Sequence, residues 1–96
     1  LNKPSVATKN TYTATFSSNS WSANAPYTQT VSVSGILATD TPITDVVLSN
    51  SSSTAAQELS SWGNVSKITT AANEITATCF AEVPTVNLNI QMLVIR

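Results

Sequence analysis

The 96-residue sequence has no histidine, one cysteine and few charged residues. Without histidine the usual zinc ligand sets cannot be assembled, and a single cysteine allows no disulfide within the chain. Charged residues make up only 9 % of the sequence, against about 25 % in an average soluble domain. We therefore expect no metal or other cofactor, and a fold that is stabilised by packing alone.

The four basic residues are too widely spaced for the positive stripe that a nucleic-acid backbone requires; they are Lys3, Lys9, Lys67 and Arg96. No run approaches the roughly 18 apolar residues of a membrane-spanning helix, and no charged segment precedes an apolar run as in a signal peptide. We expect neither nucleic-acid binding nor membrane insertion. Because the chain begins Leu-Asn-Lys, we interpret residues 1–10 as a linker remnant of a longer polypeptide and residues 11–96 as one domain.

Neutral polar residues are abundant instead. Thr, Ser and Asn together account for 38 of the 96 residues, and 42 % of the chain is hydrophobic. Thr is β-branched and favours strands, whereas Ser and Asn favour turns. Apolar and polar side chains alternate with a two-residue period in segments 11–17, 27–37, 43–49, 65–70, 74–83 and 86–95. This pattern predicts six or seven antiparallel strands.

The alternation also predicts which side chains face the core. Tyr12 and Phe16 face inward in the first segment, and Cys79 does so in the fifth. In the last segment Ile90 and Met92 belong to an uninterrupted inward set. Cys79 is therefore interpreted as a packing residue.

One segment predicts a helix, because Thr54 followed by Gln57 has the spacing of a capping box before a short run that ends at Gly63. Short strands at intervals of about ten residues indicate a sandwich or a small Greek-key barrel. We expect the barrel, because closure removes the exposed strand edges that a weakly charged sheet leaves open to aggregation. The predicted fold is all-β: a small antiparallel Greek-key β-barrel with one short helix.

The sequence offers little for catalysis. With histidine absent, five carboxylates, three lysines, two tyrosines and one thiol remain as proton donors or acceptors. Asp40 and Asp45 are the only carboxylates close in sequence, and a turn at residues 39–42 explains Asp40. Cys79 has no histidine to activate it. We therefore expect a binding protein rather than an enzyme.

Saccharide binding needs fewer specialised side chains than catalysis. A sugar presents apolar C–H faces and hydroxyl edges, so its site needs an aromatic ring beside amide or carboxylate groups. Seven residues supply these groups and are the predicted site: Trp21, Asn24, Tyr27, Asp40, Asp45, Trp62 and Asn64.

Each of the stronger candidates also has a structural interpretation. Trp62 lies one helical turn after Leu59 and could anchor the short helix to the core. Trp21 could instead plug one end of a barrel. Asp45 alternates with apolar neighbours and should face out of the sheet as an ordinary surface aspartate or at a subunit seam.

Several stretches taken together resemble one protein family. They are Trp21 to Pro26, the sequence PYTQTV and its continuation to Gly35, the sequence DTPITD from Asp40 to Asp45, and Trp62-Gly63 with the closing run to Arg96. They resemble the C-terminal head domain of receptor-binding proteins from tailed phages of Gram-positive bacteria, of the lactococcal siphophage type. The resemblance extends over nearly the whole chain from Thr11 onward.

The resemblance implies a homotrimeric protein of the phage baseplate or tail tip, on the virion and outside the host cell. Its head would be a Greek-key barrel that recognises host cell-wall polysaccharide near the seams between heads, and the region preceding it would contact other baseplate proteins. Sites in this family combine a tryptophan with polar side chains, but these positions do not align with particular residues of this chain. The alternative is a purely structural trimerising tail module without a ligand site.

Overall fold

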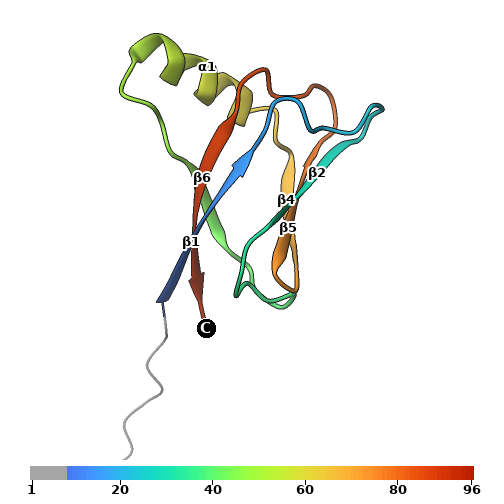
Figure 1. The fold of residues 1–96 in the computed structure, drawn as a ribbon, viewed down its shortest axis with the longest axis vertical. Helices are drawn as coiled ribbons and strands as arrows, with labels where there is room; N and C mark the ends of the chain where they lie inside the picture. The colour runs from blue at the N-terminus through green and yellow to red at the C-terminus, as the bar shows by residue number, and fades with distance from the viewer. Residues whose placement is uncertain (1–8) are drawn as a thin grey trace, which may run out of the picture.

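In the computed structural model, which describes residues 9–96, two three-stranded antiparallel sheets pack against each other through a common core (Figure 1). Sheet A has the order β1-β6-β3 and consists of Lys9–Phe16, Leu88–Ile95 and Ile43–Val46. Sheet B has the order β2-β5-β4 and consists of Tyr27–Ser32, Glu74–Cys79 and Lys67–Ala71. One helix, α1 (Ser52–Trp62), lies between β3 and β4 in the chain. The prediction of a small antiparallel all-β fold with one short helix is confirmed.

The side chains alternate in the predicted direction. In β6 every second residue from Leu88 to Val94 is buried, while Asn89 and Gln91 are exposed. Phe16 of β1 and Ile75 of β5 meet this set in the core. Cys79 is fully buried, as predicted, and burial raises the pKa of its thiol.

The structure does not show the closed barrel that the sequence predicts. Within residues 9–96 the backbone hydrogen bonds form two separate sheets. At the junction between β1 and β2 a side chain replaces the ladder. Gln29 of β2 is buried; its Nε2 donates to the carbonyl of Ser17 at 2.9 Å, and the N–H of Ser17 donates to Gln29 Oε1 at 2.9 Å. The amide thereby satisfies two backbone groups just after β1.

The segment from Val33 to Pro42 crosses from sheet B to sheet A at the other end of the molecule (Figure 1). β2 ends at Ser32, earlier than the predicted strand over 27–37, because the chain turns at Gly35, which has a φ of 95°. The predicted bend at Gly35 is confirmed. Asn73, in the two-residue turn between β4 and β5, accepts the N–H of Gly35 on its Oδ1 at 2.9 Å. The side chain of Ile36 fills the core beneath this turn and has no exposed surface.

The capping-box prediction is wrong. α1 begins at Ser52 with Ser51 at the N-cap position, and no side-chain hydrogen bond caps this end. Thr54 and Gln57 therefore lie inside the helix. The predicted end is confirmed, because Gly63 follows the last helical residue as its C-cap.

A buried carboxylate attaches α1 to the chain that follows β3. Glu58 is only 4 % exposed, and its two oxygens accept the N–H and the Oγ–H of Ser49 at 2.8 and 2.9 Å. Nowhere in residues 9–96 is a helix long and apolar enough to span a membrane.

The first strand starts at Lys9, so Lys9 and Asn10 of the predicted linker are part of sheet A. Residues 1–8, the remainder of that linker, lie outside the described residues.

Candidate functional site

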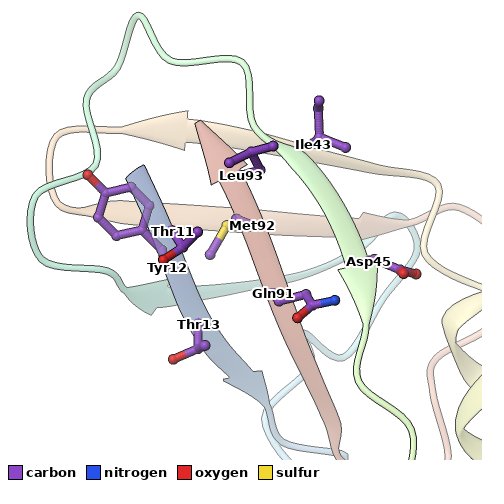
Figure 2. Close-up of a pocket in the computed structure, with 8 residues that line it drawn as sticks. All are labelled: Thr11, Tyr12, Thr13, Ile43, Asp45, Gln91, Met92 and Leu93. Carbon is purple, nitrogen blue, oxygen red and sulfur yellow. The ribbon is translucent and has the colours of Figure 1, made fainter. Parts of the chain in front are cut away.

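An open groove of about 510 Å³ crosses the three strands of sheet A (Figure 2). Six of its lining residues occupy outward-facing positions: Thr11, Thr13, Ile43, Asp45, Gln91 and Leu93. Tyr12 and Met92, which also line it, belong to the core-facing set.

The strand register arranges the six outward side chains in two neighbouring rows, which Figure 2 shows across β1, β6 and β3. The polar row is Thr13, Gln91 and Asp45, and the row beside it is Thr11, Leu93 and Ile43. Side chains directly opposite each other in such a row have Cβ atoms about 4.5–5.5 Å apart. A hydroxyl, an amide and a carboxylate therefore lie side by side, next to a mainly apolar strip.

Among residues 9–96, Asp45 is the only charged residue that lines the groove. Its Oδ1 accepts the N–H of Val46 at 2.9 Å. Within residues 9–96 that N–H lies at the unpaired edge of β3, because the next residue, Val47, donates to Asn89 of β6 at 2.7 Å and alternate residues point to opposite sides of the strand. Asp45 thus also protects a sheet edge, a structural role that its exposure alone does not reveal.

Asp40, a predicted site residue, is occupied within the protein. Its Oδ1 accepts Arg96 Nε–H at 3.0 Å, and its Oδ2 accepts Arg96 Nη2–H at 2.6 Å and the N–H of Leu37 at 2.8 Å. The side chain of Asp40 is only 4 % exposed. The hydrogen bond from Arg96 holds the pKa of the Asp40 carboxyl below its usual range. A second, smaller groove of about 330 Å³ lies beside Asp40, between the 38–42 segment and β4.

Both tryptophans pack against the core. Trp21 is half-buried and stacks on Phe16, with ring centroids 5.9 Å apart and 28° between the planes. Its Nε1 is buried without a hydrogen-bond partner among the described residues. Trp62 is likewise half-buried against the core at the end of α1.

The other three predicted residues lie elsewhere. Asn24 is exposed in the loop before β2, where its carbonyl accepts Ser22 Oγ–H at 3.4 Å. Tyr27 is half-buried at the start of β2, opposite Cys79. Asn64 follows α1. Of the seven predicted residues only Asp45 lies in the groove on sheet A, and a saccharide site built from the others stays a prediction.

Sequence reasoning missed Thr13, Gln91, Ile43 and Leu93 as one surface. One signal was present: Leu93 interrupts the polar outer face of β6. The rows themselves depend on pairing β1 and β3 with β6 in one register, which the alternation within single strands does not specify.

Residues 9–96 hold no group of three or more His, Cys, Asp or Glu side chains that could bind a metal ion. Comparison with protein-family models, curated proteins and solved structures found no match to this chain. The candidate site is therefore defined by its geometry.

Proposed function

We propose that this chain is a non-catalytic saccharide-binding domain, the head of a phage receptor-binding protein, and that the groove on sheet A is its binding site. One observation carries the proposal: the polar row of Thr13, Gln91 and Asp45 lies directly beside the apolar side chains of Leu93 and Ile43. A sugar ring has the same division, with hydroxyls at its edge and C–H groups on its faces.

The charge distribution favours a neutral saccharide. In the part of the chain that the structure describes, the groove is lined by one carboxylate, from Asp45, and by no basic side chain. An anionic polymer would meet that carboxylate without a compensating cation, which disfavours binding. Hydroxyl groups, in contrast, donate well to a carboxylate or amide oxygen.

The environment of three of the five acidic residues supports binding without catalysis. Both oxygens of Asp40 are held by Arg96, and both oxygens of Glu58 are held by Ser49. Glycoside hydrolysis usually needs two carboxylates facing each other across the substrate. The groove supplies one, Asp45.

The proposed setting is the tail tip or baseplate of a phage virion, outside the host cell, in a trimer attached to other baseplate proteins. A single open groove with few polar groups is expected to bind weakly. Three copies in a trimer, repeated over a baseplate, raise the overall affinity through effective concentration. Weak individual sites are therefore compatible with firm attachment.

A titration followed by NMR tests the proposal. Glucose, galactose, rhamnose, N-acetylglucosamine and glycerol are each added to about 20 mM, where a site of millimolar affinity is mostly occupied. We expect amide shifts at Thr13, Gln91 and Leu93 with at least one of them, and a loss of these shifts in Gln91→Ala. Gln57→Ala, which removes an exposed glutamine from α1, is the matched control. Absence of any shift in the groove would contradict the proposal.

A second candidate is a structural trimerising module of a phage tail without a ligand site. It is favoured by the exposed apolar side chains on the same face, because Ile43 is 63 % and Ile95 55 % exposed. A second copy of the chain would then cover this face. Sedimentation of Ile43→Lys separates the candidates, with Leu59→Lys on α1 as the control for adding a lysine at an exposed leucine. Dissociation in Ile43→Lys alone, without any saccharide shift in the wild type, would favour the structural module.

A further inference from the structure

The guanidinium of Arg96 makes four hydrogen bonds at the end of the molecule where the 33–42 segment crosses. Besides its two bonds to Asp40, its Nη2 donates to Tyr12 Oη at 3.1 Å and to the carbonyl of Gly35 at 2.9 Å. Tyr12 Oη itself donates to the Gly35 carbonyl at 3.3 Å. We call Arg96, Asp40, Tyr12 and Gly35 the Arg96 cluster.

The Arg96 cluster attaches the 33–42 segment to sheet A. Arg96 directly follows β6, and Tyr12 lies in β1, so both belong to the same sheet. Gly35 and Asp40 belong to the segment. Apart from the bond between Arg96 and Tyr12, all the bonds described above for the cluster run between these two parts of the chain.

The same segment is bonded to sheet B from its other side. Thr70 Oγ1 of β4 donates to the carbonyls of Ala38 and Asp40 at 3.2 and 3.0 Å. Asn73 accepts the N–H of Val33 on its carbonyl at 2.9 Å. No backbone ladder joins the two sheets in the described residues. The segment therefore connects them through side-chain bonds, which on the side of sheet A come from the Arg96 cluster.

Asp40 also closes a turn within the segment. Its Oδ2 accepts the N–H of Leu37, and its own N–H donates to the Leu37 carbonyl at 3.0 Å. The carboxylate that Arg96 holds therefore also sets the backbone of the turn. Leu37 is half exposed and contributes little packing, so if Arg96 released this turn, the side-chain bonds from Thr70 would be its main remaining tie to sheet B.

We propose that Arg96 is a latch: when it releases Asp40 and Gly35, the turn at residues 37–40 opens locally while both sheets stay folded. Tyr12, which lines the groove and packs against the core, also belongs to the cluster, so opening removes the hydrogen bond between its Oη and the Gly35 carbonyl. Arg96 is thus a positioning residue for Tyr12. The opening itself does not depend on the ligand of the groove, and its test needs none.

Native-state hydrogen exchange measured by NMR tests the latch. The reporters are the amides of Leu37 and Asp40, and the reference is the amide of Ala77 in the central strand of sheet B. Neither reporter bonds to Arg96, so faster exchange reports opening of the turn rather than loss of a partner. In Arg96→Ala we expect the Leu37 rate, divided by the Ala77 rate, to rise about tenfold, as for the loss of charge-assisted hydrogen bonds.

Two further variants make the test specific. Arg96→Lys keeps the charge but cannot bond both oxygens of Asp40 in the same fork, so we expect a smaller rise. Lys9→Ala removes an exposed cation opposite Ile95, at the same end of sheet A, and should leave the ratio unchanged.

Equal acceleration of the Leu37 and Ala77 amides would overturn the proposal, because it would indicate global destabilisation. An unchanged ratio in Arg96→Ala would overturn it as well. If Arg96→Ala does not fold, the wild type in about 1 M NaCl decides, since salt screens a partly exposed ion pair. A rise in the ratio with salt then supports the latch, and an unchanged ratio contradicts it.

Discussion

The side-chain amide of Gln29 exchanges two hydrogen bonds of 2.9 Å with the backbone of Ser17, across the junction where β1 and β2 belong to different sheets. One amide donates and accepts at once, so it replaces one rung of a backbone ladder. This pairing explains why a polar residue occupies an inward position of β2.

Replacing Gln29 with Leu tests that role. Leu removes both bonds, so the part-buried N–H of Ser17 loses its partner and the Ser17 carbonyl keeps only the N–H of Ser20 at 3.3 Å, which costs about 1–3 kcal/mol. We expect the free energy of unfolding, measured with urea, to fall by this amount. Gln57→Leu, on the exposed side of α1, should change it by less than about 0.5 kcal/mol. Equal effects of the two substitutions would contradict the role of Gln29.

The pairing of Asp40 with Arg96 predicts how stability depends on pH. The pKa of Asp40 is lowered in the folded protein, chiefly by the hydrogen bond from Arg96, while in the unfolded chain it has the ordinary value of about 3.9. A group with a depressed folded pKa contributes stability that is present above the unfolded pKa and lost as the pH falls through the folded pKa. Arg96, the titratable group that hydrogen-bonds to Asp40, keeps its charge over this pH range.

We therefore expect the wild type to have a higher free energy of unfolding than Asp40→Asn near neutral pH, and this difference to shrink only in acid. The difference in the free energy of unfolding should be constant from about pH 8 to pH 5 and should shrink below about pH 4. Urea unfolding at pH 7, 5 and 3 measures it. A difference that stays the same at pH 3 would show that the carboxylate charge of Asp40 does not contribute.

The hydrogen bonds between Ser49, which follows β3, and Glu58 of α1 predict that removing one hydroxyl destabilises the protein. Ser49→Ala removes the Oγ–H that donates to Glu58 Oε2 at 2.9 Å and leaves a carboxylate oxygen in a site only 4 % exposed. We expect a loss of about 1–2 kcal/mol in the free energy of unfolding. Ser60→Ala, at an exposed position of the same helix, is the control and should have little effect. If both variants unfold at the same urea concentration, the hydroxyl does not stabilise the helix.

The sequence predicts those features of the fold that are set by residues close together in the chain, such as the alternation of side chains along a strand. Every second side chain of β6 is inward, because a strand repeats every two residues whatever its partners are. The predicted start of α1 differs from the observed one because Ser51, Ser52, Ser53 and Thr54 form a run in which each residue is a good N-cap candidate. Local preference alone does not choose among them.

Features that depend on distant residues were not predictable in this way. Gln29 bonds to Ser17 only because β1 and β2 meet at the edges of two sheets. The sequence alone predicts Asp40 as a ligand residue, because nothing in its neighbourhood in the sequence indicates Arg96, which follows 56 residues later. The groove rows likewise require strands from both ends of the chain, since Thr13 pairs with Gln91.

Asp45 combines the proposed binding role with edge protection, and two substitutions separate them. In Asp45→Asn the side-chain oxygen can still accept the N–H of Val46, whereas in Asp45→Ala this edge N–H is free to pair with another strand. We expect light scattering to detect association at high concentration in Asp45→Ala and not in Asp45→Asn. Saccharide-induced shifts at Thr13 and Gln91 should weaken in both, because both lose the carboxylate. If Asp45→Asn binds saccharide as the wild type does, the carboxylate serves only the strand edge, and the polar row is reduced to Thr13 and Gln91.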